Sequence, residues 1–234
     1  MNCPYCNSEN VIKNGSNSSD KQKFMCKDCN RQFVENPENI TISQDTKDLI
    51  DVLLLEKIPL AGIARVTKVS ERWLQYYVNA KYEHVPKMII VTKKEKGRLT
   101  IQCDEMWSFV AYKNNKFRIW LAKNVDTKEI VGMYAGSRDM EGARGLWNSL
   151  PGVYRQCAVA YTDFWSAYEA IFPSKRHCPV EKQSGKTCST ESFNCTMRQR
   201  IARLVRKTLS FSKKLSNHIG AIWYFIHHYS VALA

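Results

Sequence analysis

Two short cysteine pairs near the N-terminus place the strongest constraint on how this chain can fold. Cys3 and Cys6 enclose two residues, Cys26 and Cys29 enclose two more, and nineteen residues separate the pairs. A Cys-x-x-Cys turn lets two thiolates bind one ion, and two such turns complete a tetrahedron around Zn²⁺. So short a segment has little core of its own and needs the metal to fold. The spacing predicts a zinc ribbon over residues 1–36 with these four cysteines as ligands, in preference to a chance pairing.

The residues between the cysteine pairs fit such a ribbon. Asn14-Gly15 is typical of a hairpin turn, and Phe24 and Phe33 can cover the metal site. Zinc ribbons bind DNA, RNA or proteins, so the motif is specific for zinc but not for a function.

The ends of the chain bear on its compartment. Met1 is followed by polar residues and cysteines rather than by the apolar run of a signal peptide. The apolar stretch over residues 219–234 is interrupted by two histidines and is too short to span a bilayer. We therefore expect a cytoplasmic protein with no membrane partner, in which cysteines bind metal rather than form disulfides.

The charge balance favours a polyanionic partner. Thirty-five Lys and Arg residues against 22 Asp and Glu give a formal net charge of +13. After Ser174 there are eleven basic residues and only two acids, Glu181 and Glu191. Phosphates that basic side chains neutralise release counterions, which favours association with nucleic acid. A basic protein that is merely soluble is the alternative.

Residues 41–80 have the pattern of short helices. Ser43 is a candidate cap for a first helix, which Pro59 is expected to end. A short helix over 60–66, a turn at 67–69 and a helix from Glu71 to Ala80 capped by Ser70 complete a helix-turn-helix.

The last of these helices is expected to read DNA. Its side chains directed at DNA are predicted to be Arg72, Trp73, Gln75 and Tyr76. A plain helical hairpin is the alternative interpretation. Residues 81–98, which are rich in lysine and have no strong periodicity, are expected to form a basic linker.

From Leu99 the pattern changes to strands. Leu99, Ile101 and Cys103 alternate with polar residues, so Asp104 is expected to point away from the apolar face. Further strands are predicted over 117–125, 129–136 and 157–162, and helices over 140–150 and 165–172. This order predicts an α/β domain over residues 99–234.

Three acids stand out in this domain. Asp104 is expected in the middle of a strand and Asp163 at the end of another, where an unpaired carboxylate is costly. Glu191 begins a predicted helix that runs from Thr190 to Ser210. Acids at one sheet edge could share divalent metal ions, whereas surface salt bridges are the alternative for each of them. Glu105, on the other face of the strand, is the nearest competitor.

The predicted helix over 190–210 divides its side chains among three faces. Glu191, Asn194 and Arg198 share one line at i, i+3 and i+7. An apolar stripe and a basic face, which would hold phosphates, occupy the rest. The basic face comprises Arg200, Arg203, Arg206 and Lys207, and Lys213 lies beyond it.

These residues resemble the insertion sequence one transposases of bacteria. The shared segments are Cys103-Asp104-Glu105-Met106-Trp107, Tyr161-Thr162-Asp163-Phe164-Trp165 with Tyr168, and Glu191-x-x-Asn194 leading into the run from Arg203 to Lys213. The last run is the most specific. The resemblance covers nearly the whole chain, because those proteins also begin with a zinc ribbon and a helix-turn-helix.

The resemblance implies an RNase H-like catalytic domain of the DDE type. It implies that Asp104, Asp163 and Glu191 bind Mg²⁺ or Mn²⁺, two ions about 3.5–4 Å apart, and that the protein recognises terminal inverted repeats. DNA contacts are expected from Asn194, Arg198, Arg203, Arg206, Lys207 and Lys213. The partners are double-stranded element ends and target DNA in the bacterial nucleoid, and a homo-oligomer is expected because two ends must meet.

Two other functions are compatible with the same residues. One is a zinc-ribbon transcriptional regulator whose C-terminal domain is not catalytic, which would bind a specific sequence without metal-dependent cleavage. The other is an RNase H-like nuclease, or a transposase that has lost activity. The acids at all three expected places argue against such a loss.

Overall fold

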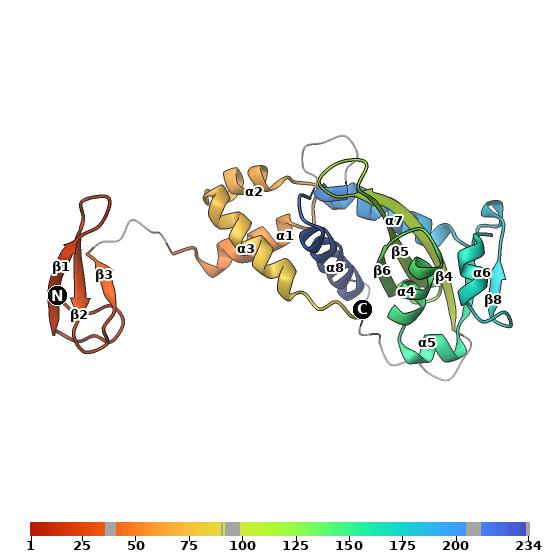
Figure 1. Ribbon diagram of the computed structural model, residues 1–234, viewed down its shortest axis with the longest axis horizontal. Helices are drawn as coiled ribbons and strands as arrows, with labels where there is room; N and C mark the ends of the chain where they lie inside the picture. The colour runs from red at the N-terminus through yellow and green to blue at the C-terminus, as the bar shows by residue number, and fades with distance from the viewer. Residues whose placement is uncertain (36–40, 90, 92–98, 205–211, 233–234) are drawn as a thin grey trace. The chain divides into compact units, whose positions relative to one another are not determined.

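In the computed structural model of the chain, residues 1–35, 41–89, 91, 99–204 and 212–232 are described (Figure 1). The chain divides into two compact units, Met1–Asp45 and Thr46–Ala234. None of the helices in these described ranges is long and apolar enough to cross a membrane.

The first unit is built around a three-stranded antiparallel sheet. Its strands, in spatial order, are β1 (Val11–Ser16), β2 (Gln22–Cys26) and β3 (Gln32–Val34). Phe24 and Phe33 are register partners on β2 and β3, and their rings stack with centroids 5.9 Å apart. The two aromatic side chains therefore stabilise this small sheet by packing on each other.

The predicted turn at Asn14-Gly15 is wrong. Both residues lie inside β1, and the register with β2 shifts between Lys13 and Ser16, where β1 holds one residue more than its partner. Gly15 has a φ of +69°, so the glycine makes a β-bulge rather than a turn. The chain reverses at residues 17–21 instead, where the N–H of residue 17 bonds to the carbonyl of residue 21.

Three helices follow: α1 (Gln44–Leu53), α2 (Leu60–Thr67) and α3 (Glu71–His84). Ser70 caps α3 as predicted, because its Oγ accepts the N–H of Trp73 at 3.2 Å. Lys68, in the turn before it, has a φ of +56° and ends α2. The first helix does not run to Pro59. The N–H of Glu56 bonds to the carbonyl of Leu53, three residues back, and this tighter turn ends α1.

Helix α3 continues to His84, beyond the predicted end at Ala80, because its last turn packs against α8 (Leu215–Val231). The rings of Tyr82 and Tyr224 lie 5.9 Å apart. A Cβ added to Gly220 would lie 2.5 Å from Cβ of Tyr82, so glycine is needed where the two helices touch. The three helices and α8 are thus parts of one packed body (Figure 1).

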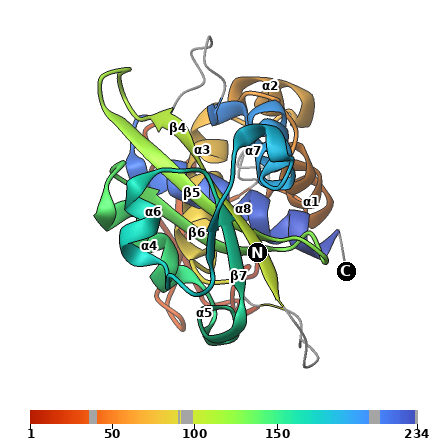
Figure 2. The same cartoon turned by 90° about the vertical axis from the view of Figure 1, so that its right-hand side faces the viewer.

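A mixed five-stranded sheet forms the centre of the second unit and confirms the α/β class. Its order is β6-β5-β4-β7-β8, with β4, β5 and β6 antiparallel and β7 and β8 parallel to β4 (Figure 2). The strands are β4 (Thr100–Phe109), β5 (Lys116–Asn124), β6 (Ile130–Gly136), β7 (Val159–Thr162) and β8 (His177–Pro179).

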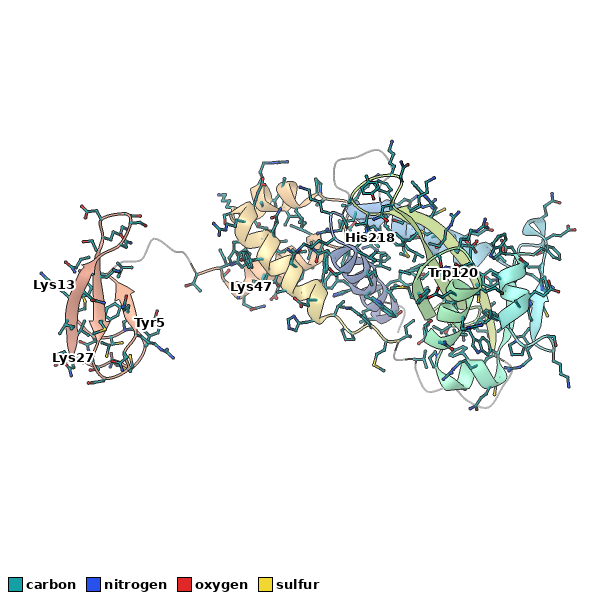
Figure 3. The ribbon with its side chains drawn as sticks, viewed as in Figure 1. Tyr5, Lys13, Lys27, Lys47, Trp120 and His218 are labelled. Atoms are coloured by element: carbon teal, nitrogen blue, oxygen red, sulfur yellow. The ribbon has the colours of Figure 1, made fainter. Side chains whose placement is uncertain are left out.

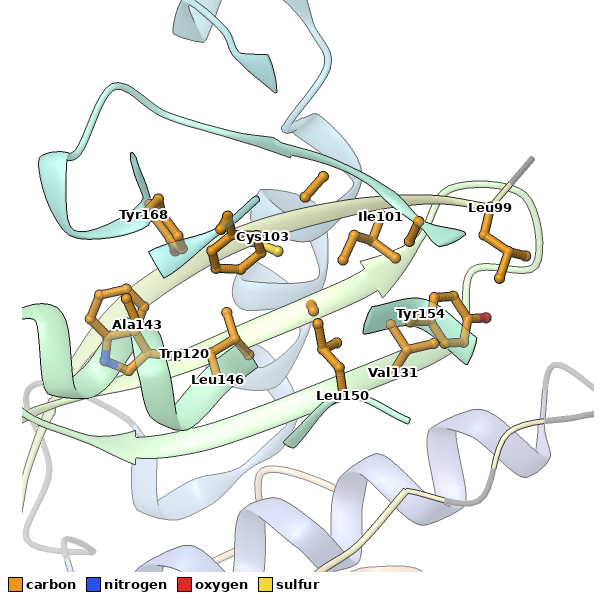
Figure 4. Packing of buried hydrophobic residues seen from close by; sticks show 14 of the residues in the cluster. Leu99, Ile101, Cys103, Trp120, Val131, Ala143, Leu146, Leu150, Tyr154 and Tyr168 are labelled. Atoms are coloured by element: carbon orange, nitrogen blue, oxygen red, sulfur yellow. The ribbon is translucent and has the colours of Figure 1, made fainter. Parts of the chain in front are cut away.

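One face of this sheet carries the main apolar core (Figure 4). It is covered by α4 (Met140–Ser149), α5 (Gly152–Cys157) and α6 (Ser166–Ile171). Trp120 of β5 is fully buried, contacts the Tyr168 ring edge-on at 5.3 Å, and donates its Nε1–H to the carbonyl of Ser137. A Cβ on Gly142 would lie 2.6 Å from the Trp120 ring, so this glycine lets α4 approach the sheet.

The other face is covered by α7 (Cys188–Arg200) and α8. His218 of α8 is buried there between two hydroxyl groups, 3.0 Å from Oγ of Ser108 and 3.1 Å from Oγ of Ser212 (Figure 3). Desolvation lowers the pKa of His218 to about 4. The imidazole is therefore neutral and joins β4 to the segment before α8.

The single helix predicted from Thr190 to Ser210 is not present in that form. Helix α7 ends at Arg200, and Ile201 has φ −90° and ψ 107°, outside the helical region. A short 3₁₀ turn, Ala202–Leu204, follows, and residues 205–211 lie outside the described residues. The chain bends here because two nearby arginines contact different parts of the protein. Arg200 pairs with Glu56, and Arg203 stacks over the Tyr82 ring.

Candidate functional site

The four predicted zinc ligands converge. The sulfur atoms of Cys3, Cys6, Cys26 and Cys29 all lie within 4.8 Å of one another. Those of Cys3 and Cys29, and those of Cys6 and Cys26, are 3.6 Å apart. Tetrahedral Zn²⁺ with Zn–S bonds of about 2.3 Å separates its sulfurs by roughly 3.8 Å. The cluster therefore has the size and the ligands of a structural zinc site.

The two cysteine knuckles have the same backbone geometry. The N–H of Cys3 bonds to the carbonyl of Ser8, and that of Cys26 to the carbonyl of Arg31, five residues on in each case. The backbone N–H of Cys29 donates to the sulfur of Cys26, which is the main reason why the pKa of Cys26 is lowered to about 7. This hydrogen bond favours the thiolate of Cys26, the form that binds metal.

A second group of side chains lies on the α7 side of the central sheet. Asp104, in the middle of β4, is partly buried. Desolvation is the main reason why its pKa is raised to about 7, and the negative charges of Glu105 and Glu191 contribute. Nδ2 of Asn194 donates to Oδ2 of Asp104 at 2.6 Å and partly offsets this rise. A carboxylate in such a place is stabilised by a cation.

Helix α7 holds Glu191 on the same side of the sheet as Asp104. Its first turn is anchored to Gln102, two residues before Asp104: the Thr190 hydroxyl donates to the carbonyl of Gln102 at 3.0 Å. The N–H of Ser189 donates to the Gln102 side chain at 3.1 Å. Thr190 and Gln102 are both buried. These contacts fix the start of α7, and with it Glu191, against β4.

Asp163 reaches the same level from the neighbouring strand. Gln102 of β4 pairs with Tyr161 of β7 in a parallel register. Two residues further on are Asp104, still in β4, and Asp163, one residue past the end of β7. Neighbouring strands lie about 4.8 Å apart, and residues opposite each other share a face. Oδ1 of Asp163 accepts the N–H of Trp165 at 3.1 Å, which turns the chain after β7.

The three acids come from three elements but do not form a compact cluster like that of the cysteines. In the described part of the chain, no second group of three or more potential metal ligands meets as the four sulfurs do. Asp104 and Glu191 interact electrostatically, and Asp163 follows directly after β7, the strand that pairs with β4. The two aspartates and the glutamate are thus arranged around an open edge of the sheet.

Glu105 is excluded from this group by the alternation of β4. Its side chain is 3% exposed, and it accepts the Nε–H of Arg138 at 2.8 Å and the hydroxyl of Tyr168 at 3.1 Å. These donors lie on the face covered by α4 and α6. The charge of Glu105 is thus already compensated, whereas that of Asp104 is not.

Of the residues predicted to read DNA, three form an exposed face of α3: Arg72, Gln75 and Tyr76, the last 73% exposed. Trp73 is partly buried and stacks on Tyr77, with ring centroids 5.2 Å apart. The exposed face is accessible to a partner, and Trp73 packs beneath it.

Of the basic residues predicted near the C-terminus, the described ones differ in their surroundings. Arg203 bonds to Ser212 at 3.2 Å and stacks over Tyr82, so it is engaged within the protein. Arg198 lies 3.4 Å from the carbonyl of Trp107. Lys213 is exposed, and Asn194, at 6% exposure, is buried against Asp104 rather than placed on the surface. Arg206 and Lys207 lie outside the described residues.

Sequence reasoning missed the buried polar residues that hold α7 in place. Lys123 of β5 is 5% exposed, donates to the carbonyl of Ser189 at 3.3 Å, and packs under the Phe193 ring. Gln102 is its register partner on β4. Both are polar residues inside strands. In the sequence, such polar residues at strand positions were the available sign that a polar contact covers the second face of the sheet.

Two family models match the chain. One described as IS1 transposase matches residues 98–230, and one described as InsA N-terminal domain matches residues 1–30. The insertion element iso-IS1n protein InsB of Shigella dysenteriae is 33% identical over 130 residues, which cover 55% of this chain and 94% of that protein. The IS1 9 protein InsB of Escherichia coli K12 is 28% identical over 163 residues, or 68% of this chain and 94% of that protein. Because the first model spans more than half of the residues, this chain belongs to the IS1 transposase family.

Proposed function

We propose that this chain is a DDE-type DNA transposase that binds the terminal inverted repeats of an insertion sequence and cuts and joins DNA strands with Asp104, Asp163 and Glu191. Membership of the IS1 transposase family supports the class of reaction. The mixed sheet with helices on both faces supports an RNase H-like fold for residues 99–234.

The observation that carries the proposal is the uncompensated carboxylate of Asp104 in the middle of a strand. Its raised pKa means that the protein alone does not fully satisfy the charged form. Glu191 adds a second negative charge nearby, and strand register brings in Asp163. Carboxylate oxygens are the ligands that Mg²⁺ and Mn²⁺ prefer. Divalent ions bound there would supply Lewis-acid stabilisation of a reacting phosphodiester and lower the pKa of an attacking hydroxyl.

In this proposal the three acids bind and orient, and no side chain acts as a nucleophile. Asp104 lies in β4 and Asp163 directly follows the adjacent strand β7, and together they would define one side of the site. Glu191 approaches from α7, whose first turn is fixed by Thr190 and Gln102. Rigid elements thus hold the carboxylates in place before DNA arrives, which positions water or a 3′-hydroxyl for in-line attack.

DNA recognition is assigned to the other parts of the chain. We assign a helix-turn-helix to α2 and α3, because three residues join them and Arg72, Gln75 and Tyr76 face outward. The zinc ribbon and Lys213 would add phosphate contacts. We also propose a homo-oligomer on DNA, since two element ends must be joined, acting in the bacterial cytoplasm at the nucleoid.

Incubation of the zinc-loaded protein with labelled terminal-repeat DNA, Mg²⁺ and a target plasmid tests the proposal. Joined products are expected and would require both cleavage and strand transfer. Nicked DNA without joining would indicate a nuclease instead. A shifted but intact probe would indicate a regulator and would refute the enzyme assignment.

A further inference from the structure

The amide group of Asn194 has two polar atoms in different situations. Its Nδ2 donates to Oδ2 of Asp104 at 2.6 Å. Its Oδ1 is buried and has no hydrogen-bond partner among the described residues. The whole residue is 6% exposed, on the side of α7 that faces β4. One half of the amide is thus strongly bonded to an acid of the site and the other half is unsatisfied.

The orientation of this amide is set by its neighbour. In its ionised form, the form that binds metal, Asp104 only accepts hydrogen bonds, so the NH₂ group then has to face Asp104 and the carbonyl oxygen has to face away from it. Buried oxygen atoms without a partner are rare in folded proteins, because they lose their contacts with water and gain nothing. Such an atom is expected where a further partner binds.

The position of Asn194 on α7 gives that partner a location. Asn194 lies three residues after Glu191, so the two side chains are neighbours along one side of the helix. Phe193 and Met197 of the same helix are buried in apolar contacts. Asn194 is therefore next to both acids, bonded to Asp104 and one helical turn from Glu191, which a divalent cation would join.

We propose that Asn194 positions Asp104 for metal binding: it holds Oδ2 of the carboxylate, leaves the other oxygen for the cation, and offers its own Oδ1 to the water molecules that the cation keeps. This inference rests on the function proposed above. It gives Asn194 a role in the metal site rather than the contact with DNA that its sequence position indicated.

Asn194→Leu in the zinc-loaded full chain is the direct test, because leucine has the same number and branching of side-chain heavy atoms as asparagine but neither polar atom. Binding of Mn²⁺ is followed from the electron paramagnetic resonance signal of the free ion. We expect Asn194→Leu to weaken Mn²⁺ binding about 10-fold, as the loss of a residue that orients a metal ligand does. The melting temperature without Mn²⁺ should fall, because the Nδ2–H bond to the partly buried Asp104 carboxylate is lost, so the Mn²⁺ affinity is the deciding measurement.

A purely structural role predicts a lower melting temperature with unchanged Mn²⁺ affinity, and unchanged affinity would overturn the inference. Gln199→Leu, on an exposed position of the same helix, is the matched control. If Asn194→Leu fails to fold, Asn194→Ser provides the second test with the same expected weakening. Asp104→Asn separates the two proposals: if it leaves Mn²⁺ binding intact, the proposed function fails and this inference fails with it. If it abolishes binding while Asn194→Leu binds normally, only the inference fails.

Discussion

The zinc ribbon and the acidic site differ in how the side chains proposed to bind metal are brought together. In the ribbon, ligands from two short turns meet within 4.8 Å although the unit around them has only three short strands. In the acidic site, the proposed ligands come from β4, from the residue after β7 and from α7, and the surrounding core is large. On this proposal the ribbon depends on metal for its fold, whereas the acidic site depends on the fold to bind metal. Local sequence spacing is sufficient for the first and not for the second.

Removal of zinc should produce the largest difference between the two regions. Structural zinc contributes on the order of 10 kcal/mol to such modules. A strong chelator should abolish amide protection in β1, β2 and β3 and leave that of β4 and β5 unchanged, as measured by hydrogen exchange with mass spectrometry. Cys26→Ser should behave like the chelated protein and Cys157→Ser, at an exposed cysteine, like wild type. Amide protection that persists in the ribbon after zinc is removed would contradict this difference between the two regions.

Substitution of an acid should have the converse effect, a loss of chemistry without a loss of fold. Asp163→Ala should reduce strand transfer on the order of 1000-fold or more, because charge stabilisation in the transition state is removed. Binding of the terminal repeat, measured by gel shift, should be nearly unchanged. Glu169→Ala, an exposed acid of α6, serves as the control. Strand transfer retained by Asp163→Ala would refute its assignment.

The pH dependence of stability should distinguish the acidic site further. Folding raises the pKa of Asp104 from 3.8 to about 7, so the folded state holds the proton more tightly than the unfolded one. The resulting stabilisation is present below pH 4 and is lost as the pH rises to 7, at most about 4 kcal/mol. Urea unfolding in the absence of divalent ions should show this loss. Asp104→Asn should remove the loss, and Mg²⁺ should reverse it; equal pH profiles for the variant and wild type would contradict this account.

The smallest expected effect concerns the anchor of α7. Thr190→Val keeps the shape of the side chain and removes its hydrogen bond to the carbonyl of Gln102, which should cost about 1 kcal/mol. Because Glu191 follows directly, strand transfer should also fall, by roughly 10-fold. Thr196→Val, on the same helix, removes only an exposed bond to the carbonyl of Ser192 within α7, and as the control it should change neither quantity. A stability loss without a rate loss would show that α7 does not position Glu191 through this contact.

Much of the ribbon and of the hairpin between β5 and β6 could be predicted from sequence, because both depend on local chemistry. The cysteine spacing gave the ligands, and Asn124 accepts the N–H groups of Asp126 and Thr127 in the turn expected there. Asn14-Gly15 shows the limit, since a glycine with positive φ suits a bulge as well as a turn.

Features that depend on distant contacts were not predicted. Strand β8 has only three residues, and it exists because it pairs with β7. The end of α7 depends on contacts of Arg200 and Arg203 with residues more than one hundred positions away. The three acids were found from their strand and helix positions. The burial of Asn194 against Asp104 was not, because it depends on how α7 packs on β4.

A crystal of the zinc-loaded protein soaked in Mn²⁺ tests the central claim most directly, through the anomalous scattering of manganese. The account predicts a peak about 2.2 Å from carboxylate oxygens of Asp104, Asp163 and Glu191. It would be contradicted by manganese at other residues, or by an Asp163 side chain directed away from the bound ion.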